Sequence, residues 1–218
     1  MQIIEQRSQE WFKIRKGKIT SSEVHKIMGK EGFSETAKTY LLEKVSEFYG
    51  GAASSATGIA LEWGTNWEPV AIEHYSDTTK TQVDKASFIV YNDYYGGSPD
   101  GIAPPEGIIE VKCPYTSAKH FKHGMIKTDA DFKKIASDYY YQCISNMICA
   151  NAQWCDFISF DPRVDSEYTM FVYRLNRNED EVKSMIDRIE QAAKYMEELK
   201  ELFKKRNNQL ITEVDPAQ

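Results

Sequence analysis

Ser98-Pro-Asp100-Gly-Ile-Ala-Pro-Pro-Glu-Gly-Ile-Ile-Glu110-Val-Lys112 is the most informative stretch of this sequence. Its last six residues are rich in strand formers, and the Pro-Pro-Glu-Gly turn before them folds the segment around Asp100 back against that strand. Side chains alternate along a strand, so Glu110 and Lys112 point to one face while Val111 points to the other, into the core. The sequence therefore predicts that two carboxylates and one lysine converge on one spot.

Such a spot suits a hard divalent cation. Mg²⁺ takes oxygen ligands in an octahedron and keeps several waters, so Asp100, Glu110 and the backbone carbonyl of Val111 suffice as protein ligands. A cation there would polarise a phosphoryl oxygen and lower the pKa of a bound water, which is the chemistry of phosphodiester hydrolysis. Lys112 could orient or deprotonate that water, or offset charge in the transition state. The plainer alternative is that Asp100 caps a turn and that Glu110 and Lys112 are a surface pair.

The distribution of charge permits a nucleic-acid substrate despite a net charge of −6. Acidic residues concentrate near the C-terminus, so the net charge excludes only a uniformly basic coat. Two basic clusters flank the informative stretch; ordinary solvated faces are the alternative interpretation of such clusters. The first contains Arg7, Lys13, Arg15, Lys16, Lys18, Lys26 and Lys30, and the second contains Lys112, Lys119, Lys122, Lys127, Lys133 and Lys134.

Length and composition indicate a single compact domain over residues 1–218. The chain is 41% hydrophobic and 28% charged, and a chain of this size builds a core without disulfides or metals. We find no apolar run of membrane-spanning length, and the N-terminus lacks the basic start and apolar stretch of a secretory signal. We therefore expect a cytoplasmic location and no membrane partner.

The cysteines and a histidine pair favour packing roles over a structural zinc site. The cysteines form no CxxC pair, and the HxxH pair has no carboxylates beside it at helical spacing. We therefore expect buried or inert thiols. The residues are Cys113, Cys143, Cys149, Cys155, His120 and His123.

Hydrophobic periodicity divides the chain into a helical N-terminal part (1–75), a sheet core (86–175), a C-terminal helix (179–205) and a frayed tail (207–218). A first helix begins at the Ser8 cap and ends before Gly17, and a second short helix, capped by a serine or threonine, runs to Met28. Further helices are expected at 36–49, 59–75 and 136–150, strands at 86–91, 107–112, 154–160 and 168–175, and a loop at 50–58.

The motifs, taken together, resemble those of the phage lambda exonuclease family. Ser-Pro-Asp-Gly followed by Glu-Val-Lys-Cys-Pro is similar to the core of these YqaJ-like viral alkaline exonucleases, which belong to the PD-(D/E)XK nuclease superfamily. Four further matches follow the family order from residue 11 to residue 163. They are Trp11-x3-Arg15-x-Gly17-x-Ile19-Thr20-x-Ser22-Glu23-Val24, Trp63-Gly64-x3-Glu68, Tyr139-x2-Gln142 and Phe160-Asp-Pro-Arg163.

The resemblance implies an α/β fold with a PD-(D/E)XK restriction-endonuclease-like core, a central mixed β-sheet flanked by helices. It implies that Asp100, Glu110 and the Val111 carbonyl bind Mg²⁺, and that Glu68 holds a second ion, directly or through water.

It also implies roles for polar residues around those ligands. Lys112 would serve the attacking water, and Gln142 would position the water or Lys112. Arg15, Ser22 and Ser98 would form a pocket for a 5′-phosphate, with Thr20 assisting. A helix N-terminus near Ser22 and the guanidinium fork of Arg15 would supply donors to that anion.

The function that this resemblance implies is a 5′→3′ exonuclease acting on linear double-stranded DNA. It would digest one strand to mononucleotides and leave 3′ single-stranded overhangs for phage-type recombination by strand annealing. The resemblance also implies two Mg²⁺ ions, with Mn²⁺ as a substitute, and a ring-shaped homotrimer. It further implies a single-strand annealing partner and a phage- or prophage-encoded protein in a bacterial cytoplasm. The alternatives are a restriction-type or structure-specific endonuclease of the same fold and a non-catalytic DNA-binding scaffold.

Overall fold

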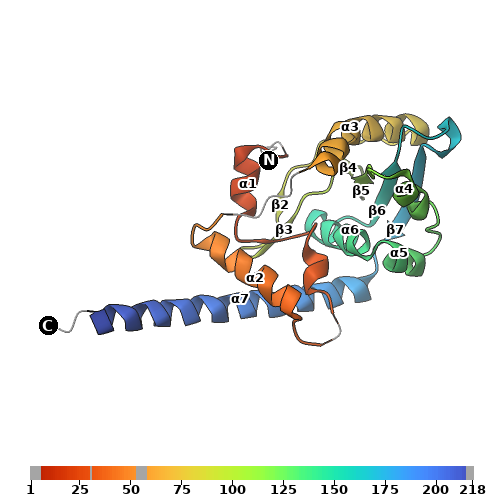
Figure 1. Ribbon diagram of the computed structural model, residues 1–218. Coiled ribbons are helices and arrows are strands. Elements are labelled where there is room, and N and C mark those ends of the chain that lie inside the picture. The colour runs from red at the N-terminus through yellow and green to blue at the C-terminus, as the bar shows by residue number, and fades with distance from the viewer. Residues whose placement is uncertain (1–5, 30, 53–57, 215–218) are drawn as a thin grey trace.

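The computed structural model describes residues 6–29, 31–52 and 58–214 (Figure 1). The elements follow one another as α1 (Gln9–Arg15), β1 (Ile19–Thr20), the 3₁₀ helix η1 (Val24–Ile27), α2 (Glu35–Phe48), α3 (Ile59–Thr79), β2 (Ile89–Val90), β3 (Tyr95–Gly97), β4 (Gly101–Ala103), β5 (Gly107–Lys112), α4 (Ser117–His123), α5 (Asp129–Ile135), α6 (Ser137–Ala150), β6 (Trp154–Phe160), the 3₁₀ helix η2 (Ser166–Tyr168), β7 (Met170–Asn176) and α7 (Glu179–Val214). No helix in these ranges is both long and apolar enough to cross a membrane.

A mixed four-stranded sheet in the order β4-β5-β6-β7 forms the centre of the fold. β4 and β7 are antiparallel to their neighbours, whereas β5 and β6 run parallel and pair Lys112 with Ser159. A smaller sheet in the order β1-β3-β2 lies beside it and joins β1 to β3 in parallel, with Thr20 opposite Gly96. The predicted mixed sheet flanked by helices is confirmed.

The two faces of β5 pack against different helices. Ile109 and Val111 are buried in one cluster with Ala71 and Tyr75 of α3. Ile108 belongs to the second cluster, which holds the apolar side of α6. Because side chains alternate along a strand, Glu110 and Lys112 share the α6 face with Ile108, as predicted.

Several elements differ from the predicted ones. The expected helix up to Met28 is only a four-residue 3₁₀ turn without a side-chain cap. The strand expected at 86–91 shrinks to Ile89–Val90 because its partner β3 has only three residues. Two short helices, α4 and α5, were not predicted. Residues 53–57 of the predicted 50–58 loop lie outside the described residues.

Of the predicted frayed tail, residues 215–218 lie outside the described residues and residues 207–214 are helical, because α7 continues to Val214. Its distal turns extend past the rest of the molecule in Figure 1 and are exposed from Glu201 to Gln209. Ion pairs three residues apart, such as Lys200–Glu197 at 2.7 Å, support an exposed helix. The two asparagines at 207 and 208 are modest helix formers rather than breakers.

The cysteines and the histidine pair occupy packing positions. Cys113, Cys143 and Cys155 are buried, and Cys149 is partly buried. His120 and His123 place their Nδ1 atoms 2.9 and 3.0 Å from Ser159 Oγ and so attach α4 to β6.

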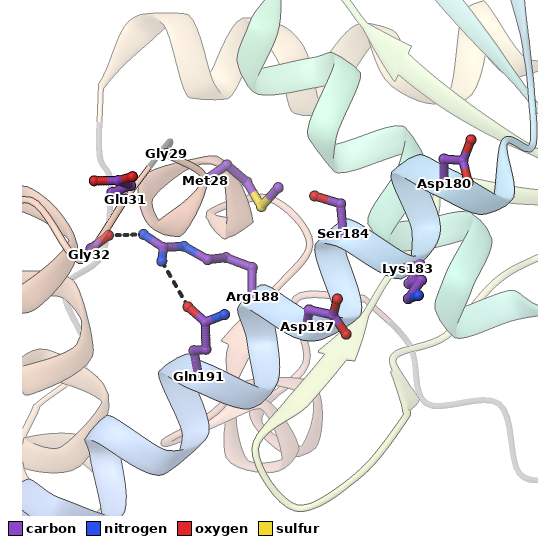
Figure 2. Close-up of a pocket in the computed structure, with 10 residues that line it drawn as sticks. All are labelled: Met28, Gly29, Glu31, Gly32, Asp180, Lys183, Ser184, Asp187, Arg188 and Gln191. Atoms are coloured by element: carbon purple, nitrogen blue, oxygen red, sulfur yellow. Dashed lines mark hydrogen bonds between the residues drawn. The ribbon is translucent and has the colours of Figure 1, made fainter.

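Arg188 ties α7 to the segment after η1 (Figure 2). The side chain is 8% exposed and borders a cavity of about 440 Å³. Its Nε donates to the carbonyl of Ile27 at 2.6 Å, Nη1 donates to Gln191 Oε1 at 3.0 Å, and Nη2 donates to the carbonyl of Gly32. Its guanidinium also lies over the ring of Phe33 at 4.1 Å. One cation therefore satisfies backbone carbonyls more than 150 residues away in sequence.

Arg188→Met should lower the free energy of unfolding by about 1–3 kcal/mol, because two carbonyls lose a charged donor. Arg188→Lys keeps the charge but loses the fork, so its loss should be smaller. Urea unfolding of the three proteins measures this order. Equal stability of Arg188→Met and the wild-type chain would contradict the anchoring role.

Candidate active site

A buried glutamate on β5 lies at the centre of the site. Glu110 is 0% exposed. Gln142 Nε2 donates to its Oε1 at 2.6 Å, and Asn146 Nδ2 donates to its Oε2 at 2.8 Å. Lys112 Nζ also donates to Oε1. Gln142 and Asn146 lie four residues apart on α6 and so share one helix face, which fixes both carboxylate oxygens.

Asp100 reaches this glutamate from the turn between β3 and β4. Its Oδ2 accepts a hydrogen bond from the backbone N–H of Val111 at 2.7 Å. The β4–β5 hairpin pairs Gly101 with Ile109 and holds the turn in place. The two carboxyl groups also share one electrostatic environment, because the charge of Asp100 contributes to the raised pKa of Glu110. The predicted meeting of Asp100, Glu110 and Lys112 is therefore present in the structure.

Glu68 on α3 is the third carboxylate near this centre. Its side chain is 20% exposed, and Arg7 Nη2 donates to its Oε2 at 3.1 Å. Its charge contributes to the raised pKa of Glu110, which places it in the same electrostatic environment. We call Glu68, Asp100 and Glu110 the carboxylate cluster.

The carboxylate cluster resists ionisation. Burial and then the charge of Asp100 raise the pKa of Glu110 to about 8. Burial also raises the pKa of Asp100, and burial followed by the charge of Asp100 raises the pKa of Glu68. Close carboxylates titrate as a unit, so the cluster retains a proton near neutral pH.

This donor set fits a hard divalent cation. Within the described ranges, no three acidic, histidine or cysteine side chains already converge as a complete metal-binding group. Asp100, Glu110 and a backbone carbonyl nevertheless offer oxygen donors whose repulsion a cation would relieve, and Mg²⁺ retains waters for its other positions. Asp100, Glu110 and the Val111 carbonyl would hold one ion, and Glu68 would serve a second.

Lys112 is a cation in this environment. Burial lowers its pKa, but the charges of Glu110 and Asp100 outweigh burial and hold the pKa well above its usual value. Its Nζ lies 5.0 Å from the ring centroid of Tyr139 on α6. Lys112 therefore offers a positive charge and N–H donors at the cluster.

The predicted phosphate-binding residues fall into two groups. Arg15 stacks on the ring of Trp11 at 3.9 Å, and Trp11 Nε1 donates to Ser98 Oγ at 3.4 Å, so Trp11 links Arg15 to Ser98. Burial lowers the pKa of Arg15 to about 10, and the guanidinium stays positively charged at neutral pH. The hydroxyls of Thr20 and Ser22 lie 3.3 Å apart.

Parallel pairing of β1 and β3 brings these groups to the same sheet edge. Thr20 lies opposite Gly96, and Ser22 and Ser98 each lie two residues after one member of this pair. The helix that follows Ser22 is the short 3₁₀ helix η1, which begins at Val24, and the N–H of Glu23 before it is bonded to the Thr20 carbonyl at 2.9 Å. Arg15 and the hydroxyls remain as donors for an anion.

Asn146 and Arg7 are site residues that the sequence analysis missed. Asn146 follows Gln142 by one helical turn, and that spacing was the available signal. Its Oδ1 is buried without a hydrogen-bond partner among the described residues. A Cβ on Gly97 would lie 2.6 Å from this oxygen, so only glycine fits beside it. For Arg7, nothing in the local sequence indicates a partner 61 residues away.

A mixed sheet that carries an Asp, a Glu and a Lys in this arrangement defines a PD-(D/E)XK-type nuclease. The YqaJ-like viral recombinase domain matches residues 10–153 of the chain. The chain belongs to this family, and it is a nuclease of this family.

Solved structures agree with this assignment. The alkaline exonuclease LHK-Exo from Laribacter hongkongensis is 27% identical, with a TM-score of 0.82 over 93% of this chain and 100% of that one. The same enzyme has been solved in complex with dAMP, with a TM-score of 0.81 and the same identity and coverage. A phage-related exonuclease from Haemophilus somnus 129PT shares the fold at 17% identity, with a TM-score of 0.72 over 85% of this chain and 96% of that one. A comparison with curated proteins gave no significant match.

Cation affinity should rise with pH and level off above about pH 8. Because Glu110 has a pKa of about 8 without a cation, binding below this pH must release its proton. Isothermal titration calorimetry with Mg²⁺ at pH 6, 7, 8 and 9, in buffers of different ionisation enthalpy, measures affinity and proton release. Glu110→Gln should remove the pH dependence together with most of the affinity. An affinity independent of pH in the wild-type chain would contradict this account.

Asn146→Leu should weaken Mg²⁺ binding by about 10–100-fold, because Glu110 loses the donor that fixes one of its oxygens. Ser145→Ala is the matched control: Ser145 is also buried on α6, but it bonds Ser21 and Tyr95 rather than Glu110. Calorimetry should show near wild-type affinity for the control. An equal loss in both variants would indicate a general effect of repacking α6.

Proposed function

We propose that this nuclease is a metal-dependent 5′→3′ exonuclease that digests one strand of linear double-stranded DNA to mononucleotides. It would leave 3′ single-stranded overhangs for recombination by strand annealing. One observation carries the proposal: Ser98, which Trp11 links to Arg15, lies two residues before Asp100. A terminal phosphate held by Arg15 and Ser98 would therefore lie beside the carboxylate cluster.

Each residue around the cluster would have a separate role in hydrolysis. Mg²⁺, when bound, would polarise the phosphoryl oxygen and promote ionisation of a water. Lys112, held as a cation by Glu110 and Asp100, would orient that water and offset charge developing on the phosphate. Gln142, through its bond to Glu110 Oε1, would keep the glutamate aligned beside Lys112.

A relative supports the proposed product. LHK-Exo has been solved with dAMP, a mononucleotide of the kind that stepwise digestion would release. Each cut would create a new 5′-phosphate, which the same Arg15 and Ser98 donors would bind. This repetition would move the enzyme along one strand.

The family resemblance supplies the remaining parts of the proposal. It implies two Mg²⁺ ions or Mn²⁺ in their place, a ring-shaped homotrimer around the duplex, and a single-strand annealing partner in a bacterial cytoplasm. A ring would reconcile a net charge of −6 with a DNA substrate, because basic residues such as Lys119 and Lys122 would face the duplex.

Linear duplex with 5′-phosphates should be digested fastest, the same duplex without them more slowly, and closed circles not at all. Lys112→Ala should abolish release of mononucleotides while leaving DNA binding largely intact. Gel and acid-soluble nucleotide assays with Mg²⁺ measure both results. Equal cutting of closed circles would indicate an endonuclease of the same fold, and wild-type rates in Lys112→Ala would remove this lysine from the reaction.

A further inference from the structure

Arg7 is a cation beside the carboxylate cluster to which the proposed function gives no role. Its Nη2 lies 3.1 Å from Glu68 Oε2, and the two side chains are 43% and 20% exposed. The charge of Arg7 also affects Asp100, which lies outside that ion pair. Burial raises the pKa of Glu68 and of Asp100, and the charge of Arg7 opposes the rise at both residues.

Contacts of the two neighbouring residues hold Arg7 at this position. Gln6 Nε2 donates to the carbonyl of Pro99 at 3.0 Å, which attaches the segment to the residue before Asp100. Ser8 caps α1 on the other side by accepting from the Trp11 N–H. Between them, Arg7 has a φ of 66°, a left-handed conformation that side-chain-bearing residues rarely adopt. Contacts on both sides therefore direct its side chain toward the cluster.

Two positive groups, a divalent cation and the Arg7 guanidinium, compete for the single carboxylate of Glu68. The resemblance assigns this carboxylate to a second divalent cation, whereas the structure pairs it with the Arg7 guanidinium. Two positive groups at one carboxylate repel each other. The existing pair is partly exposed and therefore weak, so a divalent cation can displace it at little cost.

We propose that Arg7 exchanges partners: it is the counterion of Glu68 in the metal-free enzyme, and it binds a phosphate of the DNA once a cation takes Glu68. This inference rests on the proposed function and adds a substrate-binding residue to it. A released guanidinium beside the cluster has a fork of donors that matches phosphate oxygens. The exchange would also modestly raise the Mg²⁺ concentration at which the site fills.

The first experiment measures cation binding without turnover. Arg7→Gln should bind Mg²⁺ about threefold more tightly than the wild-type chain in calorimetry, because a competing surface charge is gone. Arg7→Lys keeps the charge and should behave as wild type. Lys16→Gln removes an exposed charge of the same sign from the same region and should leave affinity unchanged.

The second experiment measures DNA binding in the Lys112→Ala background, which keeps the substrate intact. With saturating Mg²⁺, adding Arg7→Gln should weaken binding of a 5′-phosphorylated linear duplex about tenfold, the loss of one charged hydrogen bond. Without Mg²⁺, the same change should have no effect, because Arg7 is then paired with Glu68. Fluorescence anisotropy at fixed salt measures both affinities.

The outcomes separate this inference from the proposed function. Unchanged or weaker Mg²⁺ binding in Arg7→Gln overturns the exchange. The exchange is also overturned if Arg7→Gln leaves the DNA affinity unchanged when Mg²⁺ is present. If the wild-type chain still binds Mg²⁺ and digests linear duplex, the proposed function survives either result. A wild-type chain that binds no divalent cation overturns both.

Discussion

The burial of one carboxylate beneath a helix is the constraint on which the rest of this site depends. Glu110 is fully buried, and a buried carboxyl group needs hydrogen-bond partners. Two amides one turn apart on α6 supply them, at 2.6 and 2.8 Å. This contact fixes how α6 lies on the sheet. It also sets which face of β5 carries Lys112 and which face packs Val111 against α3.

The cluster around Glu110 is electrostatically costly. Burial raises the pKa of all three carboxyl groups, and the charge of Asp100 adds to the rise at Glu110 and Glu68. Lys112 and Arg7 offset this repulsion only in part. Such strain is typical of functional sites, where groups are arranged for a ligand or a transition state rather than for stability. A divalent cation is the ligand whose charge and oxygen preference best match it.

A short chain segment connects this cluster to the donors proposed to bind a phosphate. Ser98 and Asp100 follow β3 directly, so the pairing of β3 with β1 places both at once. Trp11 contacts both Arg15 and Ser98 and joins helix α1 to that segment. Gly97 allows the close approach, because a Cβ there would collide with Ser21 and Asn146. Small shifts at β3 would therefore disturb the carboxylate cluster and the proposed phosphate-binding donors together.

The sequence determined the features that depend on local periodicity. β5 and β6 begin and end where strand patterns predict, and the convergence of Asp100, Glu110 and Lys112 follows from a tight hairpin and a two-residue repeat. Only the tertiary structure decided which distant side chains complete the site. Trp11 meets Ser98 across 87 residues, Arg7 meets Glu68 across 61, and Asn146 meets Glu110 across 36. The short β2 likewise depended on its partner strand. Such contacts arise from packing between elements, and no local pattern encodes which elements meet.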